Sequence, residues 1–224
     1  MNLLSHYYLD AEEGRPYYNT GLVMPDLMGS FKKGWKPTKS PVFNNNHQKE
    51  LYSGMLQHQE TDKQFHASPF FTRAIPDIRK IFEKNGLKSP GVRLFFVAHI
   101  MLELMLDRLI LLDSRAYADN FYSDINKVDV EEITNFFQVD PMNGEYNFSG
   151  FFQKFRDAKY IYNYTDDENF IYALNRIMKR AAQPVFEGEN IVALFKNAIF
   201  EVEKYLVPVY LQRFDELKEK SKTS

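Results

Sequence analysis

The most apolar stretch of the sequence, residues 92–112, limits what this chain can fold into. At about 1.5 Å per residue it is long enough to cross a bilayer as a helix. It nevertheless contains Arg93, His99, Glu103, Asp107 and Arg108, and ionisable side chains at the centre of a bilayer cost several kcal/mol each. The stretch therefore predicts a helix buried inside a protein and no membrane contact.

Three of these ionisable residues share one face of the predicted helix. His99, Glu103 and Asp107 follow one another at intervals of four residues, so they drift by only about 80° around the helix axis. Burying two carboxylates and an imidazole is costly unless something neutralises them. A divalent cation would do so directly, and a network of ion pairs with nearby arginines is the alternative.

A second ladder of the same kind lies upstream. His58, Asp62 and His66 have the same spacing, on a helix expected from about residue 47 to residue 65. Facing helices that each carry histidines and carboxylates build the metal sites of helical bundles, and these ligands suit Mn, Fe, Mg or Zn. The alternatives are a solvated helix face for His58 and Asp62, and a helix-dipole contact for His66.

The remaining chain predicts an all-α fold, because helical spacing recurs throughout and sustained strand alternation is absent. Ser68-Pro69 and Ser89-Pro90 each indicate a helix start, residues 14–21 indicate a polar turn, and Pro208 is expected to kink the last helix. We expect a single-domain helical bundle over 1–224, with a metal-site half (1–112), an aromatic-rich helical half (113–219) and a frayed tail (220–224). Helical or short apolar segments are expected at 2–12, 22–29, 47–65, 68–85, 90–113, 114–126, 129–138, 148–162, 166–183 and 188–219.

Composition excludes several function classes. The absence of cysteine rules out disulfides, thiolate zinc sites, iron–sulfur clusters and a cysteine nucleophile. The 28 basic and 30 acidic residues give a net charge of −2, which argues against nucleic acid as a partner. No signal peptide is evident, so we expect a cytoplasmic protein. No phosphate-binding glycine loop, serine-hydrolase elbow or His-Glu-x-x-His motif is present.

One loop is rich in basic residues. Lys32, Lys33, Lys36 and Lys39 surround Trp35, and such a loop can hold a phosphate group or an acidic partner. A solvated surface loop is the alternative. The chain contains 20 Phe and 14 Tyr residues. Aromatic residues are dense between residues 146 and 164, where they form either core or an apolar pocket.

Four blocks of sequence, in order, resemble bacterial acyl carrier protein phosphodiesterases. Chains of that family begin Met-Asn-(Phe/Leu)-Leu-Ala-His-x-x-Leu, and this chain begins Met-Asn-Leu-Leu-Ser-His-Tyr-Tyr-Leu. The second block is an apolar run ending in an aspartate, here residues 22–26, followed by a basic glycine-containing turn, here residues 32–34. The third is His-Arg-x-Ile-Asp, partly matched by residues 58–62. The fourth is an apolar helix with acidic residues one turn apart, matched by Glu103 and Asp107.

The resemblance implies an all-α fold distantly related to the HD-type metal phosphohydrolases. It implies hydrolysis of the phosphodiester that joins the phosphopantetheine arm to acyl carrier protein, with a divalent metal such as Mn. The metal and catalytic set carried over from the family consists of His6, Asp26, His58, Asp62 and Asp107, with Glu103 beside them.

The chain also departs from the family pattern. The arginine of the third block is Gln59, and a Thr-Asp pair that follows it is Phe65-His66. A histidine after the fourth-block aspartate is Arg108, while His99 stands one helical turn before Glu103. These changes indicate a relocated ligand set.

Together these features predict a metal-dependent phosphoesterase, with Mn as the first choice of metal and Fe, Mg or Zn as alternatives. We expect Asp62 or Glu103 to move the proton. A non-catalytic helical binding protein with a buried His/carboxylate network is the main alternative. A di-metal oxidase is a third, although the usual Glu-x-x-His pairs are missing. The expected metal ligands are His6, Asp26, His58, Asp62, His99, Glu103 and Asp107, and the expected phosphate-binding residues are Lys32, Lys33 and Arg108.

Overall fold

The computed structural model describes residues 1–37, 41–87, 91–139 and 147–221. All regular structure in these ranges is helical, with twelve α-helices, one 3-10 helix and no strand, so the all-α prediction is confirmed. The helices are α1 (Leu3–Asp10), α2 (Pro16–Gly21), α3 (Met24–Phe31), α4 (Asn46–His66), α5 (Pro69–Lys84), α6 (Leu94–Asp113), α7 (Ala116–Lys127), α8 (Val130–Phe137), α9 (Phe148–Ala158), η1 (Tyr160–Thr165), α10 (Asp167–Arg180), α11 (Glu189–Leu206) and α12 (Tyr210–Ser221).

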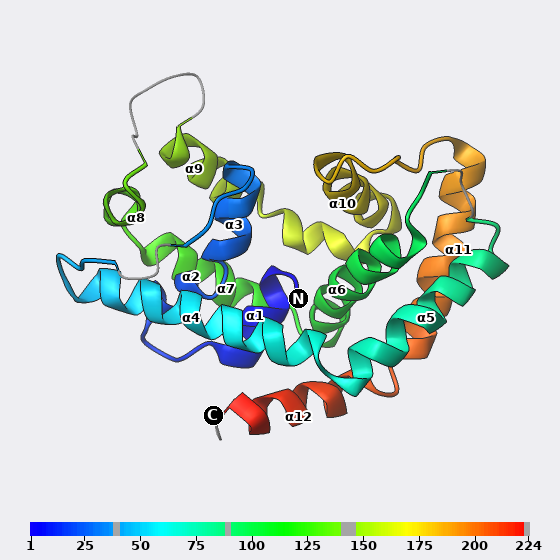
Figure 1. Ribbon diagram of the computed structural model, residues 1–224, viewed down its shortest axis with the longest axis horizontal. Coiled ribbons are helices and arrows are strands. Elements are labelled where there is room, and N and C mark those ends of the chain that lie inside the picture. Colours follow the sequence, from blue (N-terminus) through cyan, green and yellow to red (C-terminus); the bar gives the residue numbers. More distant parts are fainter. Residues whose placement is uncertain (38–40, 88–90, 140–146, 222–224) are drawn as a thin grey trace.

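The helices pack around α1 and α6, which lie side by side near the middle of the molecule (Figure 1). On one side, α2 packs on α4 and α7; on the other, α5, α10 and η1 pack on α6, and α11 covers α5. The amino terminus lies in the centre of the molecule (Figure 1), and Met1 is buried. This arrangement brings the expected site residues of α1, α3, α4 and α6 toward one region.

Polar side chains cap several helices, and at Ser68 the cap stands where the sequence predicts a helix start. The Ser68 side chain accepts a hydrogen bond from the Phe71 N–H at 3.1 Å, with Pro69 in the first turn of α5. The Asn45 side chain caps α4 in the same way by accepting from the Gln48 N–H at 3.0 Å. Such caps satisfy N–H groups that have no partner inside the helix. The predicted start at residues 89–90 lies outside the described residues.

Three predicted boundaries were wrong. The expected polar turn at 14–21 contains α2, which starts at Pro16 and buries Tyr17 to Gly21 against α4 and α7. The segment 148–162 divides at Lys159, whose φ of 42° ends α9 before η1 begins. The segment 188–219 is two helices, because Pro208 cannot donate the backbone hydrogen bond that would continue α11.

A continuous apolar core runs through the described residues, from Met1 to Leu217. The middle of α6 is buried on nearly all sides, as its composition predicts. Phe148 and Phe152 are fully buried and Tyr164 is nearly so, so the aromatic stretch contributes to the core; its first residue, at position 146, lies outside the described part. No helix in the described ranges has both the length and the apolar character that crossing a membrane requires.

The contact between α2 and α4 is made backbone to backbone. A Cβ atom placed on Gly54 would overlap the carbonyl oxygen of Tyr18, and one placed on Gly21 would overlap that of Leu51. Only glycine permits helices to approach this closely. The contact holds α4, which carries His58, against the segment that leads into α3.

We expect Gly54→Ala to lower the free energy of unfolding by about 3 kcal/mol or more, because the added methyl group meets backbone atoms that cannot rotate away. Gly29→Ala in α3 is the matched control, since a Cβ there meets nothing within 4 Å. The control should be neutral or slightly stabilising, because alanine favours the helix. Urea unfolding of both variants tests this, and an equal effect of the two substitutions would contradict the assigned contact.

Candidate metal centre

The first turn of α1 is attached to α6 by the buried carboxylate of Asp107. Its Oδ1 accepts hydrogen bonds from the Ser5 N–H at 2.8 Å and the Ser5 hydroxyl at 2.6 Å. Its Oδ2 accepts from the Leu4 N–H at 3.1 Å and from the Asn2 amide at 2.8 Å. Burial raises the pKa of Asp107 to about 7, although the hydrogen bonds from Ser5 and Leu4 oppose that shift. Asp107 thus binds N–H groups of α1 and fixes the position of the next residue, His6.

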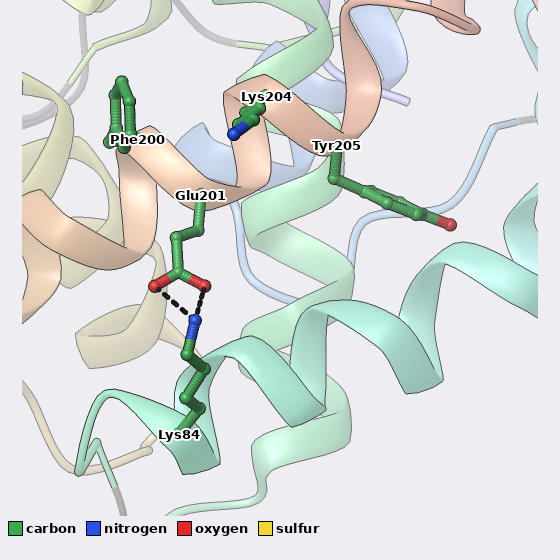
Figure 2. A pocket seen from close by; sticks show the side chains of 5 residues that line it. All are labelled: Lys84, Phe200, Glu201, Lys204 and Tyr205. Carbon is green, nitrogen blue, oxygen red and sulfur yellow. Dashed lines mark hydrogen bonds and ion pairs between the residues drawn. The ribbon is translucent and has the colours of Figure 1, made fainter.

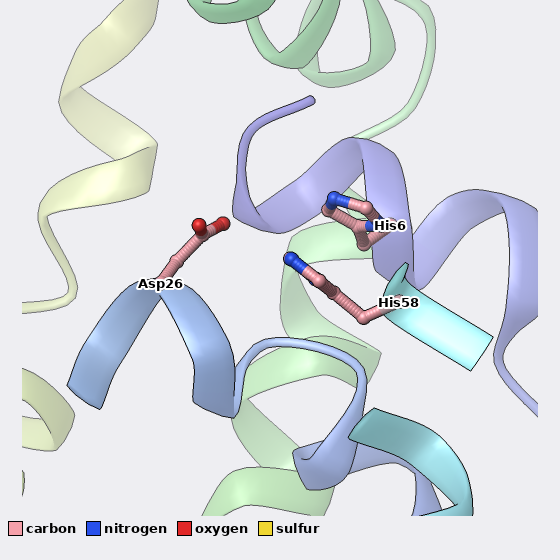
Figure 3. A group of neighbouring side chains, drawn as sticks. All are labelled: His6, Asp26 and His58. Atoms are coloured by element: carbon pink, nitrogen blue, oxygen red, sulfur yellow. The ribbon is translucent and has the colours of Figure 1, made fainter. Parts of the chain in front are cut away.

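Three helices contribute to a buried cluster that we call the inner group: His6 on α1, Asp26 on α3 and His58 on α4. One ligand atom from each lies within 4.8 Å of the other two. The two imidazoles stack with ring centroids 3.9 Å apart, and the carboxylate of Asp26 is directed toward them (Figure 3). The inner group therefore offers two nitrogens and one oxygen at a single buried point.

Several polar atoms of the inner group have no hydrogen-bond partner. Neither ring nitrogen of His6 nor Oδ2 of Asp26 makes a hydrogen bond, although all three atoms are buried; the carboxylate oxygen near Nε2 of His6 is Oδ1 of Asp62, at 3.4 Å. By contrast, Nδ1 of His58 lies 2.8 Å from the Leu22 carbonyl oxygen, and donation of its hydrogen there leaves Nε2 as a free lone pair. Unpaired buried polar atoms are costly, and a cation bound between them would satisfy them.

Burial also sets the charge of the inner group. It lowers the pKa of His6 to about 3, helped by the neighbouring His58, so this imidazole is neutral near pH 7. It raises the pKa of Asp26, while His58 and the amino group of Met1 oppose the shift. A neutral imidazole is the form that binds metal ions.

A second cluster, the outer group, consists of His66 at the end of α4 and His99 and Glu103 on α6. Nε2 of His66 and Nε2 of His99 are 3.0 Å apart. Oε1 of Glu103 lies 3.3 Å from the first nitrogen and 2.8 Å from the second. The side chains of His66 and His99 are 33% and 25% exposed, in contrast to the fully buried His6.

Asp62 and the amino group of Met1 lie between the two groups. Oδ1 of Asp62 is 2.5 Å from the Met1 nitrogen and 3.4 Å from Nε2 of His6, and Oδ2 is 3.7 Å from Nδ1 of His66. The Met1 nitrogen is also 3.1 Å from Oε1 of Glu103. Asp62 therefore borders both groups.

These contacts keep both carboxylates ionised. Burial would raise the pKa of Asp62, but the neighbouring His6 and the Met1 ammonium lower it below its usual range. Burial would likewise raise the pKa of Glu103, but the Met1 ammonium and the two outer histidines lower it well below its usual range. Burial would lower the pKa of the ammonium, yet Glu103 and Asp62 raise it to about 10.

The structure brings together most of the predicted ligands. His6, Asp26 and His58 form the inner group, His99 and Glu103 belong to the outer group, and Asp62 borders both. Asp107 lies in neither group, because its oxygens bind the start of α1.

The predicted phosphate-binding residues are more scattered. The guanidinium of Arg108 is held by Glu203 at 3.1 Å, Asp167 at 2.9 Å and the Tyr164 carbonyl at 3.0 Å. Arg108 thus joins α6 to η1, α10 and α11 and belongs to neither group. Lys32 and Lys33 are exposed after the end of α3, and residue 39 lies outside the described part.

Two features of the site were not among the predicted ligands. His66 belongs to the outer group, and its place on the i, i+4, i+8 ladder with His58 and Asp62 was the signal for it. The Met1 amino group contacts Asp62 and Glu103, which no spacing pattern could have indicated.

A surface hollow lies between α5 and α11, away from both groups. It is lined by Lys84, Phe200, Glu201, Lys204 and Tyr205 (Figure 2). Lys84 donates to both carboxylate oxygens of Glu201, at 3.1 and 2.9 Å. The charges of Lys84 and Glu201 thus compensate each other, and the hollow adds no residue to the site.

Comparison with known proteins finds no similar protein: no family model, no curated protein and no solved structure matches this chain.

We expect Asp107→Ala to lower the free energy of unfolding by about 3 kcal/mol, because it leaves the N–H groups of Leu4 and Ser5 buried without an acceptor. Asp107→Asn keeps one acceptor oxygen and should cost less. Asp157→Ala, at an exposed residue of α9, is the control and should change stability by less than about 0.5 kcal/mol. Equal denaturation midpoints for Asp107→Ala and the control would show that the attachment of α1 does not depend on Asp107.

The buried His6 makes metal-free protein sensitive to acid. Its pKa is about 3 when folded against 6.5 for the free side chain, so between these values the unfolded state binds the extra proton. Each pH unit below 6.5 then removes up to about 1.4 kcal/mol of stability. His6→Asn should lack this term, whereas His47→Asn, at an exposed histidine, should retain it. Urea unfolding at pH 7 and pH 5 in the presence of a chelator measures the difference, and a wild-type-minus-His6→Asn difference that does not vary with pH would contradict the burial argument.

Proposed function

We propose that this protein is a metal-dependent phosphoric ester hydrolase whose metal ion is held by the inner group together with Asp62. The observation that carries the proposal is the burial of His6, Asp26 and His58 at one point, with polar atoms that lack hydrogen-bond partners. Three different helices supply these residues, so the cluster does not follow from the periodicity of any one helix.

The donors of the inner group fit a divalent cation. His6 is neutral near pH 7, and the hydrogen bond of His58 to the Leu22 carbonyl leaves Nε2 available. Two imidazoles with one or two carboxylates suit Mn, Fe or Zn, and Mg less well. A bound divalent cation supplies Lewis-acid activation of a water molecule and of a phosphoryl oxygen.

Asp62 is the residue we assign to proton transfer. Its pKa lies below the usual range, so it is ionised at neutral pH and its oxygens can accept a proton from water. The side chain is 33% exposed, so water reaches it. Glu103, the other predicted proton carrier, is engaged by the two outer histidines and the Met1 amino group.

Lys32 and Lys33 are suited to bind the anionic part of a substrate. They follow α3, the helix that carries Asp26, and both are exposed. Lysine ammonium groups there attract phosphate or an acidic protein surface. Arg108, which is held by other residues, takes no part in the proposed site.

The proposed substrate class is a phosphodiester, with the phosphopantetheine linkage of acyl carrier protein as the specific candidate. The resemblance of four sequence blocks to acyl carrier protein phosphodiesterases supports this choice, and it also supports a distant relation to the HD-type phosphohydrolase fold. His6, Asp26, His58 and Asp62 are the residues shared by the resemblance and by the proposed inner site.

A non-catalytic binding protein is the second candidate function. It is favoured by one observation: the Met1 ammonium already compensates the charges of Asp62 and Glu103. In that case the inner group would be a buried polar network that binds no metal.

We expect Asp26→Asn to abolish the metal content of the inner group while raising the stability of chelator-treated protein. The substitution removes a carboxylate whose ionised form is disfavoured by burial, and an amide oxygen is a weaker ligand. Elemental analysis of protein purified without a metal-chelating tag, and melting temperatures with and without added Mn²⁺, measure the two effects. The wild type should be stabilised by excess metal and the variant should not.

The catalytic part is tested with bis-p-nitrophenyl phosphate and with acyl carrier protein carrying its phosphopantetheine arm. His58→Ala and Asp62→Asn should lose hydrolysis, whereas His47→Ala should keep it. Metal binding without hydrolysis of either substrate would refute the enzyme. Absence of bound metal in the wild type, after incubation with each ion, would support the binding protein.

A further inference from the structure

The three donor atoms of the outer group form a small triangle. Its sides are 3.0 Å between the two Nε2 atoms, and 3.3 and 2.8 Å from these atoms to Oε1 of Glu103. Ligand atoms bound about 2.0–2.1 Å from one ion lie about 2.8 to 3.0 Å apart in octahedral coordination and about 3.3 to 3.4 Å apart in tetrahedral coordination. The triangle therefore has the dimensions of one face of a coordination polyhedron.

Hydrogen bonds can satisfy only two of the three sides of this triangle. Three hydrogen-bonded pairs would need three hydrogens, but the ionised Glu103 carries none and each Nε2 carries at most one. If both Nε2 atoms are protonated, both can donate to Glu103, but the two nitrogens then stand 3.0 Å apart with no hydrogen bond between them. If one Nε2 atom is not protonated, its lone pair lies close to the carboxylate. A single cation accepts a lone pair from all three atoms at once.

The outer histidines are held in place by the structure around them. The edge of the Phe71 ring contacts both imidazoles, with centroid distances of 4.9 Å and interplanar angles of 84°. Phe71 stands in the first turn of α5, and its N–H donates to the Ser68 side chain. The Ser68 hydroxyl in turn donates to the Phe65 carbonyl at 2.6 Å. His66 therefore lies at a tightly closed junction of α4 and α5, and its position does not depend on a flexible end.

We infer that His66, His99 and Glu103 form a second metal position, specific for a late divalent transition metal of the Zn²⁺ type. Two imidazoles and one carboxylate are donors that bind Zn²⁺, Co²⁺ and Ni²⁺ more tightly than Mn²⁺ or Mg²⁺. Because the three side chains are partly exposed, the position is open to solvent and leaves coordination sites for water or a ligand.

This second position goes beyond the proposed function. It uses none of the inner ligands, and it stands if the protein hydrolyses nothing. Asp62 lies between the two metal positions. Its Oδ1 approaches His6 and its Oδ2 approaches His66.

The test is a titration of chelator-treated protein with Co²⁺, followed by displacement with Zn²⁺. Histidine-bound Co²⁺ absorbs in the visible range, so binding is detected without any activity measurement. We expect Zn²⁺ binding at one position to weaken by at least about 100-fold in each of three variants, His66→Gln, His99→Ala and Glu103→Gln. Loss of a residue that only hydrogen-bonds to a metal ligand already lowers metal affinity by about 10- to 100-fold. His66→Gln keeps a hydrogen-bonding side chain, and circular dichroism with melting in chelator confirms that each variant folds.

Asp26→Asn and His47→Ala complete the design. The inference is supported if each outer variant loses one equivalent of Zn²⁺ and the part of the visible Co²⁺ signal that belongs to it, while Asp26→Asn still binds that equivalent and His47→Ala binds the wild-type amount. If folded His66→Gln and His99→Ala bind the same equivalents as the wild type, the inference is overturned. Loss of metal only in Asp26→Asn also overturns the inference, but it leaves the proposed function standing. Loss of metal only in the outer variants supports the inference and shows that the proposed hydrolase site holds no metal.

Discussion

The hydrogen bonds that Asp107 accepts from the start of α1 underlie the rest of the site. N–H groups in the first turn of a helix have no carbonyl partner of their own, and Asp107 supplies that partner from the buried centre of α6. His6 follows directly after Ser5, and Met1 precedes the same turn, so one carboxylate places a residue of the inner group and the amino group that lies between the two groups. A charged side chain on an apolar helix serves here to join two elements of the chain.

The sequence was informative wherever a local rule acts. The Ser68-Pro69 signal correctly placed the start of α5, the composition of 92–112 predicted a buried helix, and the four-residue spacing put His99 beside Glu103. The sequence was not informative where packing between distant segments decides which residues are in contact. Asp107 continues the same spacing as His99 and Glu103, yet it meets α1, and the neighbouring Arg108 meets α10 and α11. Spacing on one helix cannot tell which other element each turn will face.

The two groups show how similar residues acquire different properties from their surroundings. The atoms of the inner group are buried, so the imidazole of His6 stays neutral and several polar atoms lack hydrogen-bond partners. The outer group is partly open, and the hydrogen bond to Glu103, which outweighs the effect of burial, raises the pKa of His66. Asp62 lies at the boundary, where its two oxygens face the two environments. A difference in solvent access therefore separates His58 in the inner group from His66 in the outer group, although the sequence presents them on the same ladder.

The glycine contact between α2 and α4 has a mechanical consequence. Gly54 stands one helical turn before His58, and Gly21 stands five residues before Asp26. The contact between the two glycines therefore couples the backbone position of His58 to that of Asp26. No side chain lies between the two backbones to absorb a displacement. A shift of one helix along the other would therefore change the distances between the ligand atoms of the inner group. The dimensions of that site are therefore set by two residues that have no functional group at all.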